Sequence, residues 1–249
     1  KNIYFFSLII SESGWDKNIE KYKFKVVNLG RVLSEILKLK KMGFSNIIMA
    51  GNIPRPGISS IKPDIHSLKI FPKLTKTLFR GGVNILLKFL ISELENRKFQ
   101  VLDIKKITPE LFLGTGNFTK TKPSKINMDD IHKGKRVLSV LSKFDIGQSI
   151  IVQQGTVLGI ESIEGTDILI KRCSKYIKRG EKATLVKLFK KKQDYRVDLP
   201  TVGLKTINMC IKNSIGGIAF SGNKTLFISY KNLIKLMEKK KLFLLGINE

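Results

Sequence analysis

Two kinds of apolar pattern alternate along this chain, and the alternation limits the fold more than any other feature of the sequence. Short apolar runs typical of buried strands include Ile3–Ile10 and Asn46–Ala50. Between and after them, apolar residues recur at helical spacing in Leu29–Met42 and Ile85–Arg97. Strands that alternate with helices usually form a parallel sheet covered by helices. The sequence therefore predicts an α/β fold.

The rest of the chain continues the pattern after a stretch without periodicity. Residues 114–130 are rich in Gly, Thr, Pro, Ser, Asn and Lys and are typical of a connection. We expect two domains, an N-terminal one at 1–118 and a C-terminal α/β one at 131–249, joined by a linker at 119–130. Further predicted elements are strands at 99–104, 183–189, 217–220, 225–229 and 242–245, a hairpin at 150–163 that turns at Gln154–Gly155, and helices at 131–144, 167–178, 201–212 and 230–239.

The formal net charge of +26 favours anionic partners such as nucleic acids, acidic lipids or phosphorylated substrates. Of the 46 basic residues, 38 are Lys and 8 are Arg, and the chain has only three Ala. This skew is typical of an AT-rich genome, to which we assign roughly half of the basic excess. Arg is scarce and no nucleic-acid-binding motif is recognised, so nucleic acid is not the expected partner.

Neither a membrane span nor a secretory signal is visible in the sequence. No run of roughly 18 apolar residues occurs, and the apolar N-terminal stretch lacks a small-residue cleavage site. Cys173 and Cys210 are far apart in sequence and are expected to be reduced thiols. We therefore expect a soluble, cytoplasmic protein.

Two stretches place carboxylates where a strand gives way to a helix. In "ESIEGTD" (161–167), Thr166 is a candidate N-cap and Asp167 suits the first helical turn, but capping does not explain Glu161 or Glu164. In "YRVDLPTVGLKTI" (195–207), Asp198 precedes Pro200 and a predicted helix with Thr201 at its entrance.

A helix N-terminus attracts phosphate, so carboxylates beside it require a cation between them and the phosphate. Mg²⁺ uses one or two carboxylates and completes its shell with water and phosphate oxygens. We expect Glu164, Asp167 and Asp198 to share a hydrated Mg²⁺, with their carboxyl groups within about 10 Å of one another. Basic side chains near these acids would neutralise the remaining phosphate charge: Lys187, Arg196 and Lys205.

Two further polar stretches are candidates for ligand contact. "AGNIPRP" (50–56) follows a predicted buried strand, and the carboxyl ends of such strands form the usual ligand edge of a sheet. Asn52 and Arg55 are the candidates there, and an ordinary Pro-bracketed turn is the alternative. In "DIGQS" (145–149), Asp145 and Gln148 either line a cleft or form a turn.

The chain resembles the LpxI-type UDP-2,3-diacylglucosamine hydrolases of lipid A biosynthesis. The resemblance is carried by "DIGQSIIVQQGTVLGIESIEGTDILIKR" (145–172) and "VKLFKKKQDYRVDLPTVGLKTI" (186–207), and by "AGNIPRP" (50–56), "LKIFPKL" (68–74) and "LFLLG" (242–246). It implies a Rossmann-like N-terminal domain with a parallel sheet, a mixed α/β C-terminal domain, and lipid bound between them.

The resemblance also implies the chemistry. Water attacks the α-phosphorus with Mg²⁺ as cofactor, giving UMP and 2,3-diacylglucosamine 1-phosphate (lipid X), and the expected catalytic residue is Asp198. It implies peripheral contact with the anionic cytoplasmic face of the inner membrane and leaves homo-oligomer formation open. The expected contacts to the lipid-linked nucleotide sugar are Asn52, Arg55, Asp145, Gln148, Gly165, Thr166, Arg196, Thr201 and Lys205.

This sequence departs from the family pattern in two places. It begins after the segment where the family has a strand and a Gly-rich turn, and it has Gly82, Val83 and Asn84 where the family has Gly-Asp-Asp. These departures favour one alternative, a non-catalytic descendant that binds the lipid. Two others remain: a basic nucleic-acid-binding module, which the net charge alone supports, and a nucleotide-sugar enzyme of another kind.

Overall fold

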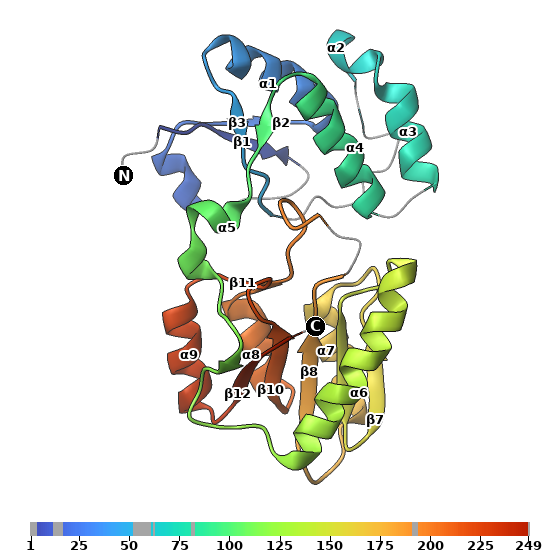
Figure 1. Cartoon of the computed structure of the whole chain (residues 1–249), viewed down its shortest axis with the longest axis vertical. Coiled ribbons are helices and arrows are strands. Elements are labelled where there is room, and N and C mark those ends of the chain that lie inside the picture. Colours follow the sequence, from blue (N-terminus) through green and yellow to red (C-terminus); the bar gives the residue numbers. More distant parts are fainter. Residues whose placement is uncertain are drawn as a thin grey trace. The chain divides into compact units, whose positions relative to one another are not determined.

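The chain folds into two compact units, Lys1–Leu102 and Asp103–Glu249 (Figure 1). The computed structural model describes residues 4–11, 17–51, 61, 63–80, 83–190 and 194–248. The division lies N-terminal to the predicted linker. Residues 125–130 of that linker belong to helix α6 (Lys125–Leu141), so they do not form a connection.

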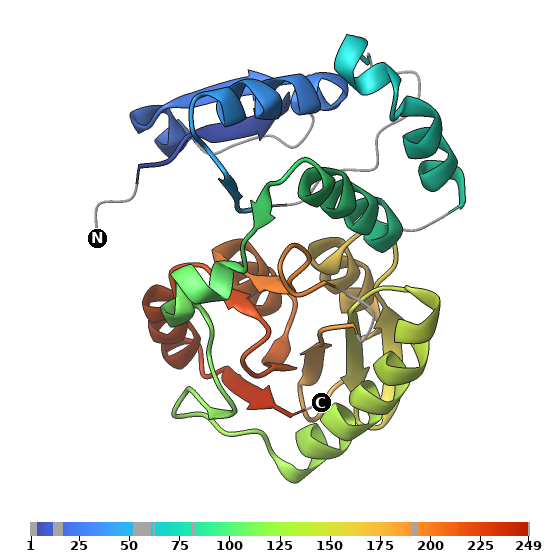
Figure 2. The ribbon, with the colours of Figure 1, turned by 45° about the horizontal axis from the view of Figure 1, so that its top comes forward.

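The described strands of the N-terminal unit pair in parallel. Strand β1 (Ser7–Ile10) pairs with β2 (Phe24–Val27), and β3 (Asn46–Ile47) pairs with β4 (Gln100–Val101). Parallel pairing was predicted, whereas β2 was not recognised in the sequence. The helices of this unit are α1 (Val32–Lys41), α2 (Ile65–Leu68), α3 (Phe71–Arg80) and α4 (Val83–Asn96). Helix α1 lies alongside the β1–β2 pair (Figures 1 and 2).

A six-stranded mixed sheet forms the centre of the C-terminal unit, with strand order β5-β12-β10-β8-β6-β7. Strands β8, β10 and β12 run parallel, whereas β6 is antiparallel to both β8 and β7. The two short strands β9 and β11 pair separately. The strand bounds are β5 (Gly116–Asn117), β6 (Ser149–Gln153), β7 (Thr156–Ile160), β8 (Ala183–Lys187), β9 (Thr201–Val202), β10 (Ile215–Ser221), β11 (Leu226–Phe227) and β12 (Phe243–Ile247).

Helices cover both faces of this sheet because successive side chains of a strand point to opposite faces. Ile150 and Val186 pack in the cluster that contains α6, while Ile151 and Leu185 pack in the cluster on the other face. That second face carries α7 (Thr166–Cys173), α8 (Leu204–Lys212) and α9 (Tyr230–Lys239) (Figure 1). A short helix α5 (Ile104–Ile107) precedes the sheet.

The predicted elements of this unit are mostly present, with shifted ends. The hairpin turns at Gln154–Gly155 as predicted. The helix predicted at 201–212 begins only at Leu204, because Thr201 and Val202 extend into β9. The helix predicted at 131–144 begins six residues earlier at Lys125, where Ser124 and Asn127 form a capping box.

Two further sequence expectations concern membranes and cysteines. None of the helices in the described parts of the chain is both long and apolar enough to cross a membrane. Cys173 and Cys210 are both free, as predicted, and both are buried.

Candidate functional site

Polar side chains gather at one edge of the C-terminal sheet, beyond the carboxyl ends of β7 and β8. Lys187 ends β8, and the antiparallel strand β6 begins opposite it with Ser149. Glu161 follows the end of β7, and its backbone N–H donates to the carbonyl of Ser149 at 2.8 Å. The carboxyl edge of an α/β sheet is the usual place for a ligand. This edge is therefore the candidate site.

The buried ammonium of Lys187 is the centre of the candidate site. Its side chain is only 3% exposed, and its Nζ lies 2.7 Å from Thr166 Oγ1 and 3.4 Å from Ser149 Oγ. Burial lowers the pKa of Lys187, and the positive charge of Lys190 adds to that shift, whereas the negative charges of Glu161, Asp167 and Asp198 oppose it. The site thus brings three carboxylates from three separate segments within electrostatic reach of one cation.

Glu161 carries a buried carboxylate with an unsatisfied oxygen. The residue is 7% exposed, and its Oε2 has no hydrogen-bond partner among the described residues. The same holds for Oε1 of the neighbouring Gln148. Buried polar atoms are nearly always paired, so two unpaired acceptors here indicate a place for a donor or a cation.

A glycine allows the approach to β7 that places Glu161. Gly147 has φ +47°, and a Cβ built on it would lie 1.9 Å from the carbonyl oxygen of Glu161. Every other residue type would push the two segments apart. Gly147 therefore fixes how the loop before β6 meets the end of β7.

Asp167 joins the first turns of α7 and α8. Its Oδ1 accepts a hydrogen bond from Thr206 Oγ1 at 2.8 Å, and its Oδ2 lies 3.3 Å from Nζ of the exposed Lys205. The N-terminal ends of the two helices are consequently held together at the site. Both ends offer free backbone N–H groups to an anion.

The predicted N-cap role of Thr166 is wrong. Gly165 occupies the N-cap position with φ 79° and ψ 168°, and Thr166 is the first residue of α7. The Thr166 hydroxyl instead meets Lys187 and lies 3.1 Å from the hydroxyl of Ser149. Its function here is to connect the helix to strands β6 and β8.

Glu164 does not join the other acids as predicted. Its Oε1 pairs with Arg172 at 2.8 Å, and its Oε2 accepts from the backbone N–H of Ser162 at 3.2 Å. The hydrogen bond from Arg172 lowers the pKa of Glu164. The turn after β7 directs this carboxylate towards its own helix.

The predicted metal site of Glu164, Asp167 and Asp198 is therefore not assembled. Throughout the described ranges, no three acidic, His or Cys side chains are grouped closely enough to hold a metal ion together. Mg²⁺ needs only one or two carboxylates. Asp167 and Asp198, which both act electrostatically on Lys187, are the candidates for such a smaller set.

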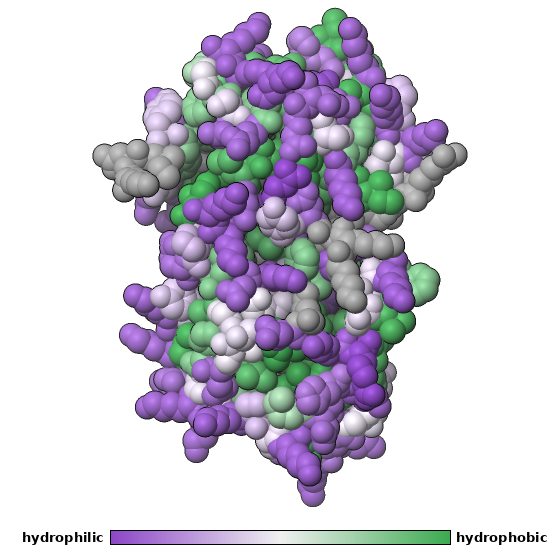
Figure 3. Space-filling view, viewed as in Figure 1, coloured by the Kyte–Doolittle hydropathy of each residue, from purple (hydrophilic) through white to green (hydrophobic). Residues whose placement is uncertain are grey.

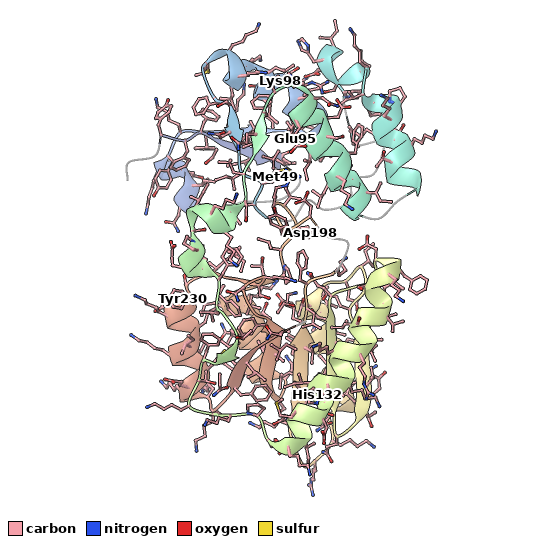
Figure 4. The ribbon with its side chains drawn as sticks, in the orientation of Figure 1. Met49, Glu95, Lys98, His132, Asp198 and Tyr230 are labelled. Carbon is pink, nitrogen blue, oxygen red and sulfur yellow. The ribbon has the colours of Figure 1, made fainter. Side chains whose placement is uncertain are left out.

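Asp198 lies in the loop between β8 and β9 (Figure 4). Its backbone N–H donates to the carbonyl of Asp194 at 3.0 Å, which closes a turn. Arg196 in this turn binds Asp194 through its backbone N–H, its Nε and its Nη2. The guanidinium expected to meet substrate is thus bound to Asp194 within this turn.

Two other predicted contact residues, Asp145 and Thr201, make bonds of their own. Asp145 has φ 59° and pairs with Lys190 at 2.5 Å. Thr201 is exposed and donates to the carbonyl of Leu199 at 3.2 Å. Gln148 lies beside Glu161 at the sheet edge, as described above.

The predicted residues of the N-terminal unit are outside what the structure describes. Asn52 and Arg55 lie outside the described residues. Val83 and Asn84 begin α4, and their side chains are likewise not described.

From the sequence, Lys187 was expected only as one of three basic neighbours of the acids, and Ser149 was not expected at the site. A usable signal was present, because Lys187 stands in the apolar run "ATLVKLF" (183–189), which forms a fully buried strand and the start of the loop after it. A lysine that must be buried needs charged or hydroxyl partners. Ser149 gave no comparable signal, because a serine at a strand end is common.

Comparison with known proteins agrees with this architecture. The family model of the LpxI N-terminal domain matches residues 3–111, and that of the LpxI C-terminal domain matches residues 114–245. The UDP-2,3-diacylglucosamine pyrophosphatase LpxI of Caulobacter vibrioides is 30% identical to this chain, over 98% of the chain and 89% of that relative.

Proposed function

Because the chain belongs to the LpxI family, we propose that it hydrolyses the diphosphate of UDP-2,3-diacylglucosamine in lipid A biosynthesis. The products are UMP and 2,3-diacylglucosamine 1-phosphate (lipid X). The observation that carries the proposal is the match to the Caulobacter pyrophosphatase, which extends over 98% of this chain. The site at the carboxyl edge of the C-terminal sheet supports the same chemistry.

The residues of that edge have two roles: the acids would bind the metal, and the other groups bind the phosphate oxygens. Asp198 and Asp167 are the residues that would hold Mg²⁺, and Asp198 also orients the attacking water. Mg²⁺, when bound, supplies charge stabilisation on the diphosphate and a more acidic water. The free N–H groups at the starts of α7 and α8 and the exposed Lys205 bind phosphate oxygens.

Lys187 and its hydroxyl partners hold this arrangement in place. The ammonium donates to Thr166 at the start of α7, and the Asp167 carboxylate accepts from Thr206 on α8. Both helix starts are therefore fixed relative to β8 before substrate binds. A fixed set of donors stabilises charge in the transition state without rearrangement.

We also propose that this edge meets the anionic surface of the inner membrane from the cytoplasmic side. Phe144 is 70% exposed in the loop before β6, and Ile163 is 90% exposed in the turn after β7. Both loops lie at the same edge of the sheet, and Lys143 is exposed next to Phe144. Exposed apolar side chains beside lysines suit a lipid surface. Elsewhere, hydrophilic side chains are spread over the visible face of each unit (Figure 3).

The test of the proposed function is hydrolysis in water enriched in ¹⁸O. The purified chain is incubated with UDP-2,3-diacylglucosamine and Mg²⁺, and both products are examined by mass spectrometry. Attack at the α-phosphorus places the label in UMP. Label in lipid X would contradict attack at that phosphorus, and release of neither product would contradict the proposed activity.

A further inference from the structure

Two hydroxyls and one ammonium group meet at the candidate site, and each comes from a different element. Ser149 Oγ on β6 and Thr166 Oγ1 at the start of α7 lie 3.1 Å apart. Nζ of Lys187 on β8 lies 2.7 Å from Thr166 Oγ1 and 3.4 Å from Ser149 Oγ. Ser149 is fully buried and Lys187 is 3% exposed, whereas Thr166 is partly exposed. Thr166 is therefore the one of these three residues that a ligand can reach.

The donors and acceptors of the three groups fix the direction of their hydrogen bonds. An ammonium group has three N–H donors and no acceptor, whereas a hydroxyl has one donor and accepts through two lone pairs. Lys187 therefore donates to both hydroxyls. The proton of the buried Ser149 hydroxyl needs an acceptor inside the protein, because buried polar groups are nearly always paired. Among the bonds of the described residues, Thr166 Oγ1 is the acceptor open to it, so Ser149 donates to Thr166.

The hydroxyl proton of Thr166 consequently points away from the other two groups. Thr166 Oγ1 accepts from Lys187 and from Ser149, and these two bonds occupy both of its lone pairs. Its own O–H has no acceptor in the parts of the chain that the structure describes. Because Thr166 is the first residue of α7, this proton is left for a ligand at the start of that helix.

The surroundings of this proton favour an oxyanion as its acceptor. The first backbone N–H groups of α7 have no partners within the helix, and the N-cap residue Gly165 has no side chain to bind them. The helix dipole is positive at this end, and the buried ammonium of Lys187 adds a full positive charge behind Thr166. Phosphate oxygens accept strong hydrogen bonds from donors in such a place.

We propose that Ser149 and Lys187 are positioning residues that direct the Thr166 hydroxyl towards a phosphate oxygen of the substrate diphosphate. Thr166 is then a catalytic residue, because its hydrogen bond strengthens as negative charge gathers on that oxygen in the transition state. The two positioning residues act through Thr166 and touch no substrate atom. This inference rests on the proposed function, which supplies the diphosphate.

The first test compares variants that keep or lose the Thr166 hydroxyl. Thr166→Val keeps the shape of the side chain and removes the donor, so kcat/KM for UDP-2,3-diacylglucosamine should fall about tenfold or more. Thr166→Ser keeps the donor and should retain most of the activity. Wild-type activity of Thr166→Val, or equal losses in Thr166→Val and Thr166→Ser, would overturn the inference.

Ser149→Ala tests whether Ser149 acts through Thr166. Its kcat/KM should fall several-fold, whereas the same substitution in the Thr166→Val background should cause no further loss. Ser174→Ala is the matched control, because the Ser174 hydroxyl donates to the carbonyl of Lys171 at the other end of α7, and it should turn over normally. A merely structural Ser149 would lower kcat/KM by the same factor in both backgrounds, which would contradict the inference. Circular dichroism checks folding, and Ser149→Ala alone still tests the inference if Thr166→Val does not fold.

Binding of inorganic pyrophosphate, measured by calorimetry, separates this inference from the proposed function. Thr166→Val and Ser149→Ala should bind pyrophosphate more weakly than the wild type and Ser174→Ala do. If the wild type releases no UMP but the four proteins bind in this order, the proposed substrate fails and the role of the hydroxyl stands. If the wild type releases UMP and all four bind equally, only the inference fails. A wild type that neither releases UMP nor binds pyrophosphate would overturn both.

Discussion

Substitution of Gly147 by alanine should destabilise the C-terminal unit through a contact that can be worked out from the structure. The residue has φ +47°, and its new Cβ would lie 1.9 Å from the carbonyl oxygen of Glu161 and 2.7 Å from the carbonyl carbon. The left-handed conformation alone costs about 1–2 kcal/mol for an L-residue. Displacing the neighbouring backbone adds about 1–3 kcal/mol, the usual scale for overpacking. The expected loss is therefore roughly 2–5 kcal/mol in the free energy of unfolding.

Gly155→Ala separates conformational strain from the contact. Gly155 has φ +75°, and no described atom lies within 4 Å of a Cβ built there. This control should lose only the strain of about 1–2 kcal/mol. Urea denaturation followed by circular dichroism measures both variants against the wild type. If Gly147→Ala is no less stable than Gly155→Ala, the close approach of the loop before β6 to Glu161 is refuted.

Three other predictions concern the surroundings of the site. The pKa of Glu164 is lowered by Arg172, so its ion pair stabilises the fold above the usual glutamate pKa of about 4.3 and loses this effect as the pH falls below it. The stability gap between wild type and Glu164→Gln should therefore shrink between pH 7 and acid pH in urea titrations, and a constant gap would contradict the ion pair. Burial raises the pKa of both thiols, so Ellman's reagent should label Cys173 and Cys210 in urea but not in the native protein. In vesicle sedimentation, the chain should bind anionic vesicles more than neutral ones and Phe144→Ser should bind less, whereas equal binding to both vesicle types would contradict the charge contribution.

Much of the C-terminal unit could be predicted from sequence because its strands are buried and its helices amphipathic. The hairpin turn at Gln154–Gly155 followed from turn chemistry, and both positions have positive φ. The start of α6 was missed, because a segment rich in Pro, Ser and Lys resembles a loop until the capping box that Ser124 forms with Asn127 is known. Helix ends depend on such individual bonds, which periodicity does not encode.

The candidate site was only partly predictable for a similar reason. The repeated order of strand, acid and helix led us to expect Asp167 and Asp198 at one Mg²⁺ ion, which stays a prediction; in the structure both acids act electrostatically on Lys187. Glu164 was grouped with them by its neighbourhood in sequence, whereas the turn after β7 directs it to Arg172. The direction of a side chain in a tight turn depends on backbone angles, and these are not readable from spacing. Lys187 is hydrogen-bonded to Thr166 and Ser149, which are distant from it in sequence. Residue spacing does not reveal such contacts.

The most direct test of the account is turnover of UDP-2,3-diacylglucosamine by Asp198→Asn. The change keeps the shape of the side chain and removes its charge, so the thermal melt should stay near that of the wild type. UMP release with Mg²⁺ should fall about 100-fold or more, the usual loss when one charge-stabilising group is removed. Asp129→Asn, at an exposed position on α6, is the matched control and should turn over normally. A wild type that binds the lipid without hydrolysing it would favour the non-catalytic alternative, and Asp198→Asn that releases UMP at the wild-type rate would contradict the assignment of Asp198.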